Sequence, residues 1–254
     1  MLRMMCVMQP VSPATKAMFS RILSSALLAG AAAGLIAALL QLYFVQPILL
    51  HAELYESGDL VHFGSASKVA AVQQVGGIDL VRDGLSVVFT MLIYTGYGLI
   101  LTALMSLAAD GGAEINARTG ILWGLSGFIA VHFAPGLTLA PEVPGVAAAD
   151  VYARQIWWFA TAGAAIVAMW LIAFGRNWMS WGSAIALLIA PHVIGAPMPE
   201  VFSGPVPTEL GALFAARAFG VGMAAWVVLG AFAGHFWARA EGRLQQGQPM
   251  QGAA

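Results

Sequence analysis

The chain has 254 residues, of which 60% are hydrophobic and 9% are charged, and its formal net charge is −1. Its mean hydropathy of +0.82 lies well above that of ordinary water-soluble domains. This composition argues against a soluble globular protein, and 11 lysines and arginines in the whole chain provide no basic nucleic-acid-binding surface. We therefore expect an all-α integral membrane protein that has the lipid bilayer, and no nucleic acid, as its partner.

Six mostly uncharged segments are long enough to cross a bilayer as helices. A helix rises about 1.5 Å per residue, so roughly 20 apolar residues cover about 30 Å of hydrocarbon. The segments span residues 22–50, 85–109, 119–140, 156–174, 178–198 and 211–237. They predict a polytopic bundle of about six transmembrane helices within residues 18–240. We expect residues 1–17 to be a disordered tail or to precede the true start, and residues 241–254 to be a disordered tail.

The first segment is unusually long and contains its own break. Residues 22–50 would extend about 43 Å as one straight helix, which is more than the hydrocarbon layer needs. Gln46-Pro47 is the predicted break, because proline lacks a backbone donor and disfavours helix in the residue before it. Gln41, Gln46 and Tyr94 are candidates for a polar path, since uncharged polar groups inside a bundle can replace part of the hydration shell of an ion.

The connections between segments differ in character. Residues 51–84 form the longest one, with a short amphipathic helix predicted around residues 65–75. Residues 134–155 and 195–210 are rich in proline. Proline restricts the backbone, so we expect these two connections to be ordered turns or re-entrant pieces rather than flexible linkers.

Three apolar runs end in the same way: each reaches a histidine, acidic residues follow, and an arginine introduces the next run. The histidines and arginines are His51 and Arg82, His132 and Arg154, and His192 and Arg217. With alternating helices, all three connections lie on one side of the membrane. The pattern is compatible with three two-helix hairpin repeats, an arrangement frequent in transporters. The arginines either snorkel to the interface or pair with nearby acids, and the sequence leaves both possibilities open.

The charges are unevenly divided between the two sides of such a bundle. The side with the three histidines has nine acidic and four basic residues. The opposite side, which holds both termini, has Arg118 and Arg176 in short connections. Basic residues in short loops mark the cytoplasmic side. We therefore expect a multi-pass protein of the inner (cytoplasmic) membrane with both termini in the cytoplasm and the acidic connections outside.

The histidines and carboxylates of the acidic side are candidate ligands of a transition-metal ion, because imidazole and carboxylate together suit such ions. The predicted metal ligands are His51, Glu53, Glu56, His132 and His192. Glu53 and Glu56 lie three residues apart and can converge on one helix face, whereas His51 is offset from them. Two simpler interpretations stay open: the histidines bond only to backbone or water, and the carboxylates are the solvated end of a helix.

Glycines four residues apart predict close helix packing in lipid. The pairs are Gly30 and Gly34, Gly120 and Gly124, and Gly230 and Gly234. Residues 124–127, Gly-Leu-Ser-Gly, are also similar to the Gly-x-Ser-Gly motif of rhomboid intramembrane proteases. A nucleophilic serine needs a base within hydrogen-bond distance, and His235 lies near the end of the last segment. We favour packing for this motif, predict no catalytic residues, and keep the protease as the lesser alternative.

Several stretches of the chain resemble the CbtA family of cobalt transporter subunits. The likeness is strongest in residues 46–56 (QPILLHAELYE) and extends to residues 18–23 (MFSRIL) and to the later elements Pro-Glu-Val-Pro-Gly and Arg-Gln-Ile-Trp-Trp. It covers about Met18 to Trp237. The family is described with about five spans, one fewer than the six segments counted above.

The resemblance implies an inner-membrane protein associated with cobalamin biosynthesis that acts with a CbtB-like subunit, which is small, spans the membrane once and is rich in histidine. It implies Co²⁺ as the transported substrate. It gives no established metal ligands that could be assigned to residues of this chain. Together with the predicted ligands, it leads us to expect a subunit for cobalt uptake, without an organic cofactor, that captures the ion outside. The alternatives are a permease or scaffold subunit for another solute.

Overall fold

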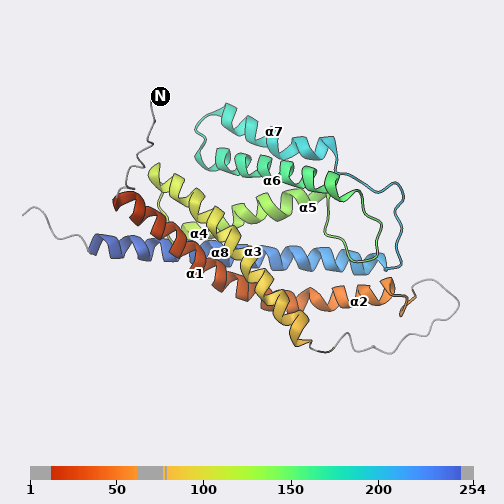
Figure 1. Ribbon diagram of the computed structural model, residues 1–254. Coiled ribbons are helices and arrows are strands. Elements are labelled where there is room, and N and C mark those ends of the chain that lie inside the picture. The colour runs from red at the N-terminus through yellow and green to blue at the C-terminus, as the bar shows by residue number, and fades with distance from the viewer. Residues whose placement is uncertain (1–12, 62–76, 78, 247–254) are drawn as a thin grey trace, which may run out of the picture.

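The computed structural model describes residues 13–61, 77 and 79–246, and this part of the chain consists of helices and loops without a strand (Figure 1). The elements are α1 (Pro13–Phe44), α2 (Gln46–Glu56), α3 (Leu80–Asp110), α4 (Ala117–Phe128), the π-helical turn η1 (Ile129–Phe133), α5 (Ala134–Thr138), α6 (Val151–Phe174), α7 (Trp178–Ile194) and α8 (Thr208–Gln246). The predicted all-α fold is confirmed. The helix predicted around residues 65–75 lies outside the described residues, as do residues 1–12 and 247–254 of the predicted tails.

Five helical stretches are long and apolar enough to cross a membrane. They are Met18–Phe44, Leu80–Asp110, Ala117–Thr138, Val151–Phe174 and Thr208–Arg243. The remaining apolar helix, α7, has 17 residues and therefore extends about 25 Å, short of the ~30 Å hydrocarbon layer. The fifth predicted segment is thus an apolar helix, but a short one. The prediction of about six helices is consistent with this arrangement.

The two ends of the bundle differ in what they carry. α1 begins and α8 ends at the same end, where Arg21 and Glu241 form an ion pair of 3.4 Å (Figure 1). At the other end, Ile48 and Ala52 of α2 share an apolar cluster with Val143, Val206 and Phe214. The two proline-rich connections also meet there, because the amide of Ala147 donates to the carbonyl of Ser203 at 2.8 Å. We call this end, where α2 carries Glu53 and Glu56, the acidic end, and we call the end with Arg21 the basic end.

The core forms where α1, α3, α4 and α8 meet. Its buried side chains include Met105 of α3, Leu229 and Trp237 of α8, and Phe128 of α4. α7 packs mainly on α6, and the two lie side by side along one flank of the bundle (Figure 1). α8 packs instead on α1 and α4. Packing therefore does not follow three separate hairpins, and the hairpin repeat stays a prediction.

The glycine pairs lie where helices approach most closely. A Cβ on Gly34 would come 2.6 Å from the Cα of Met91 in α3. A Cβ on Gly124 would meet the carbonyl of Trp226, and one on Gly230 would come 2.7 Å from the Cα of Gly124. Real side chains never approach backbone atoms so closely, so the missing Cβ lets α1 contact α3 and α4 contact α8. The predicted packing role is confirmed.

The first predicted segment breaks at the predicted place. α1 ends at Phe44, α2 begins at Gln46, and Pro47 occupies the first turn of α2. The amide of Ile48 bonds to the carbonyl of Val45 at 3.0 Å instead of reaching back to Phe44. The Phe44 carbonyl accepts a 3.0 Å hydrogen bond from Arg217 of α8, which replaces the donor that the break removes.

The third span is also not one regular helix. It was predicted as a single segment over residues 119–140, but its middle is the π-helical turn η1, in which the amide of Ala134 bonds to the carbonyl of Ile129. Such turns occur mostly singly within α-helices and often at functional sites. His132 lies in this turn, and Pro135 follows at the start of α5.

Candidate functional site

α2 presents three of the predicted ligands at the acidic end. Ile48 and Ala52 are buried against the rest of the chain, which fixes the rotation of the short helix. Glu53 and Glu56 are exposed and His51 is half-buried. The His51 ring lies 5.6 Å from the ring of Tyr55, one turn further along.

Both carboxylates of α2 are available to a cation. Within the part of the chain that the structure describes, Glu53 and Glu56 have no basic partner. Glu56 lies against the proline-rich connection, since a Cβ on Gly145 would come 3.1 Å from the Cβ of Glu56. These acids can therefore accept a divalent ion without first losing an ion pair.

His132 lies inside the bundle and is hydrogen-bonded. The indole nitrogen of Trp226 in α8 donates to Nδ1 of His132 at 3.0 Å. Indole is only a donor, so Nδ1 is the acceptor and the proton of a neutral His132 lies on Nε2. The rings of Tyr97, Phe128 and Trp226 each lie 6.1 Å from the imidazole. In this arrangement neither ring nitrogen offers a free lone pair to a metal ion.

His192 lies in the last turn of α7. Its Nδ1 lies 3.1 Å from the hydroxyl of Thr138, at the end of α5, and its ring lies 6.2 Å from that of Trp157 in α6. The contact ties α7 to the third span. His192 thus has a hydrogen-bond partner and is half-buried.

The five predicted ligands therefore occupy three separate side-chain environments. Across residues 13–61, 77 and 79–246, no three histidine, cysteine, aspartate or glutamate side chains lie together in a group that could hold a metal ion. The structure brings His51, Glu53 and Glu56 onto one short helix and leaves His132 and His192 apart from them. The ligand set stays a prediction.

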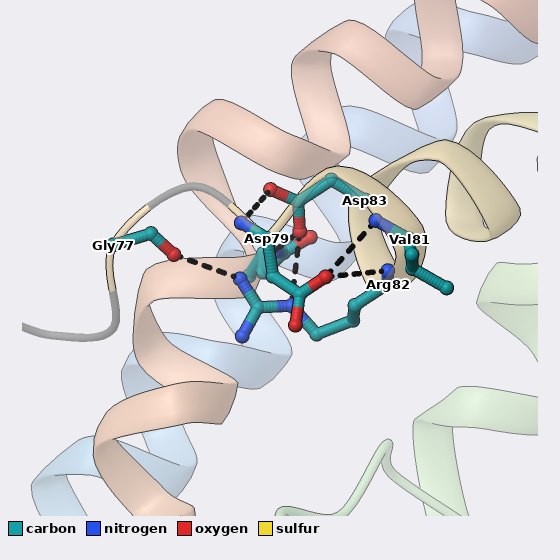
Figure 2. A network of polar contacts seen from close by, with 6 residues as sticks. Gly77, Asp79, Val81, Arg82 and Asp83 are labelled. Atoms are coloured by element: carbon teal, nitrogen blue, oxygen red, sulfur yellow. Dashed lines mark hydrogen bonds and ion pairs between the residues drawn. The ribbon is translucent and has the colours of Figure 1, made fainter.

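A polar network at the start of α3 joins Gln46, a predicted path residue, to Asp79 and Asp83, which were not predicted to be functional (Figure 2). Asp83 Oδ1 accepts from Gln46 at 2.7 Å and from Arg82 at 2.9 Å, while Oδ2 accepts from the amide of Asp79 at 3.2 Å. The Asp79 carboxylate caps the helix by accepting from the amides of Val81 and Arg82. The network ties the α1–α2 break to α3. An aspartate in the first turn of a span and a glutamine before a proline were the available signals.

The arginines at the acidic end have defined partners. Arg82 pairs with Asp83 at 2.9 Å and Arg154 pairs with Glu142 at 2.8 Å, while Arg217 donates to the Phe44 carbonyl. The sequence left snorkelling and pairing open, and the structure shows pairing for two of the three. Arg82 and Arg154 neutralise Asp83 and Glu142, which do not belong to α2, and the α2 carboxylates of Glu53 and Glu56 have no ion pair among the described residues.

The candidate path residues line the contact between α1 and α3. Gln46 bonds to Asp83, and the carbonyl oxygen of the Gln41 side chain accepts from Thr90 at 3.4 Å. Tyr94 is buried, and its ring lies 5.8 Å from that of Tyr97, which in turn contacts His132. Polar side chains thus follow one another from the acidic end toward His132.

Ser126 of the Gly-Leu-Ser-Gly motif shows packing and no catalytic pairing. Gly124 and Gly127 contact Trp226, and within the described ranges no hydrogen bond joins Ser126 to a histidine. His235 is exposed near the basic end. This arrangement favours the packing interpretation of the motif.

Comparison with protein families identifies the chain. The family described as "Probable cobalt transporter subunit (CbtA)" matches residues 19–238, well over half of the sequence. The chain belongs to the CbtA family. Membership makes it a subunit of a membrane transporter for cobalt ions, with Co²⁺ as the substrate, and the five spanning helices agree with that. Comparison with curated proteins and with solved structures gave no match.

The region that matches the CbtA family contains every element that forms the acidic end. It begins at Phe19 and ends at Ala238, so α2, both proline-rich connections and the start of α8 all belong to it. The features described above are therefore located in the family's own region and not in an added segment.

Proposed function

We propose that this CbtA-family chain captures Co²⁺ outside the inner membrane and passes it inward for cobalamin biosynthesis. The observation that carries the proposal is the family match, and the acidic end supplies a place for capture. There, Glu53 and Glu56 have no basic partner and lie on the same short helix as His51, and buried contacts set the orientation of that helix.

The five ligands act in two groups in this proposal. His51, Glu53 and Glu56 take the hydrated ion first, with water completing its coordination shell. His132 and His192 become ligands later, because each must first give up its hydrogen bond to Trp226 or Thr138. The polar side chains between α1 and α3 lead from the first group toward His132.

Selection of cobalt needs geometry rather than strength of binding. Zinc and copper bind a given nitrogen and oxygen site more tightly than cobalt does, following the order of divalent-metal affinities. Selection must therefore come from the coordination geometry that the transporter imposes and from metal availability. His132 and His192 must exchange a hydrogen bond for the ion, which adds a second step at which metals can be discriminated.

The orientation and the partner complete the proposal. Arg118 and Arg176 in the short connections of the basic end support an orientation with that end in the cytoplasm and the acidic end outside. The word "subunit" in the family description calls for at least one other chain. We propose a CbtB-like subunit, single-spanning and histidine-rich, as that chain.

Uptake of radiolabelled Co²⁺ tests this function. Cells that express the chain with its small partner are expected to accumulate the ion, and His51→Ala, Glu53→Gln and Glu56→Gln together are expected to abolish accumulation. Accumulation that is equal with and without the chain would instead indicate a scaffold or another solute. Release of fragments from a membrane-spanning peptide, lost in Ser126→Ala, would indicate the protease.

A further inference from the structure

An apolar cavity of about 660 Å³ opens on the flank of the bundle between α3, α4, α6 and α8. α3 and α6 both pack on α4 and leave this space between them. Four of the eight tryptophans line it: Trp123, Trp158, Trp170 and Trp226. The volume lies within the range of pockets that bind small ligands.

The lining excludes the transported ion as the occupant. The polar side chains of the wall are only Tyr97, Glu114, Thr119 and Ser126, and the remaining lining is apolar. A divalent cation in such a space would lose its hydration shell, and the single exposed carboxylate of Glu114 with three hydroxyl groups cannot replace that shell. The occupant is therefore apolar.

The cavity opens toward the hydrocarbon layer. Ile100, Leu122 and Phe159 on its wall are largely exposed. In a membrane this opening faces lipid acyl chains, which are flexible and as apolar as the wall, so one of them can follow a space of about 660 Å³.

The charges beside the cavity point to the headgroup. Arg118 adjoins Thr119 at the start of α4, and Arg176 follows Phe174 at the end of α6, so both lie at the basic end of the cavity. Both are exposed, and neither forms an ion pair within the described part of the chain. At this end the two arginines outnumber the one carboxylate of the wall, Glu114, and the excess positive charge matches a phosphate attached to an acyl chain.

We propose that this cavity binds one phospholipid of the cytoplasmic leaflet, with an acyl chain along the four tryptophans and its phosphate between Arg118 and Arg176. The lipid would fill the space between α3 and α6. It would also support η1, the turn that carries His132, because Ala130 and Val131 of η1 line the cavity. The binding site is distinct from the predicted metal ligands.

Two matched glycines make the test specific. Gly163 lines the cavity and Gly182 lies on α7, and in both helices an added Cβ has no heavy atom within 4 Å. A Cβ at either position therefore meets no other atom. Gly163→Leu places that side chain in the cavity, and Gly182→Leu does not.

The experiment counts phospholipids on the full chain by native mass spectrometry after purification in a mild detergent. The unchanged protein and Gly182→Leu are expected to retain one phospholipid, and Gly163→Leu is expected to lose it. Arg118→Gln with Arg176→Gln is expected to remove any preference for phosphatidylglycerol. Brominated acyl chains should quench tryptophan fluorescence more strongly in the unchanged protein than in Gly163→Leu, which checks the result without purification of a lipid complex.

Three results would overturn the proposal. One is the absence of retained phospholipid on the unchanged protein together with equal quenching in both glycine variants. Another is retention by Gly163→Leu equal to that of Gly182→Leu. The third is a cross-link between a cysteine introduced at Phe159 and the small subunit that displaces the lipid. The cobalt assays above do not enter this test, so it fails or succeeds independently of the proposed function.

Discussion

His132 accepts a hydrogen bond from Trp226, a residue 94 positions later in the chain. The residue was a predicted metal ligand because a histidine ends an apolar run before acidic residues. In the structure His132 lies in the π-helical turn of the third span, and the pattern did not predict this turn. The pattern also could not indicate the indole partner, since a single long-range contact leaves no periodic signal in either segment.

Substitution Trp226→Phe tests how firmly His132 is held. It removes the donor and leaves Nδ1 of His132 without a partner, and an unsatisfied polar group inside a bundle costs about 1–3 kcal/mol. We expect a lower unfolding temperature in detergent than for Trp123→Phe, which also replaces a tryptophan of the cavity wall but breaks none of the described side-chain hydrogen bonds. Equal unfolding temperatures for the two variants would show that the hydrogen bond contributes nothing.

At the scale of the helices, the sequence predicted the local features of each helix better than it predicted which helices contact one another. The break at Gln46-Pro47 follows from proline chemistry and lies where expected. Glycine spacing predicted close packing but not that Gly124 would face Gly230. The third span looked continuous, because η1 contains neither proline nor glycine, and the contacts of His132 with α3 and α8 are not visible in its own sequence.

Substitution Gly124→Ala tests the contact between α4 and α8. The added Cβ would meet the backbone of Trp226, which cannot move aside as a side chain can, so overpacking of about 1–3 kcal/mol is expected. Gly163→Ala is the control, because its Cβ enters open space and helix propensity alone favours alanine by roughly 0.5–1 kcal/mol. Thermal unfolding in detergent should shift down for the first and slightly up for the second, and a shift of the same sign in both would contradict the packing account.

For the whole molecule, composition and charge distribution predicted the class, the count of about six helices and two chemically different ends. The meeting of α2 with the two proline-rich connections depends on tertiary packing of Val143, Val206 and Phe214, which no local pattern reveals. The arginine partners were likewise out of reach, because Arg217 contacts a carbonyl 173 residues away. The sequence also did not show that α7 ends at Ile194 after only 17 residues, which makes it shorter than the other five apolar helical stretches.

Cysteine labelling tests the proposed orientation. In a Cys6→Ser background, which removes the only natural cysteine, Glu200→Cys at the acidic end and Arg176→Cys at the basic end are both exposed positions. A membrane-impermeant maleimide added to intact cells should label the first and not the second. The reverse pattern would place the acidic end in the cytoplasm and turn the proposed capture site into a release site.

Direct binding of Co²⁺ to the purified chain tests the central claim, which is that α2 captures the ion. Equilibrium dialysis should show that His51→Ala with Glu53→Gln and Glu56→Gln weakens binding at least about tenfold, which corresponds to ~1.4 kcal/mol. The matched control, His235→Ala with Glu200→Gln and Glu209→Gln, removes the same groups elsewhere and should bind as the unchanged protein does. Equal affinity in both triple variants would contradict the account and leave α2 without a role in capture.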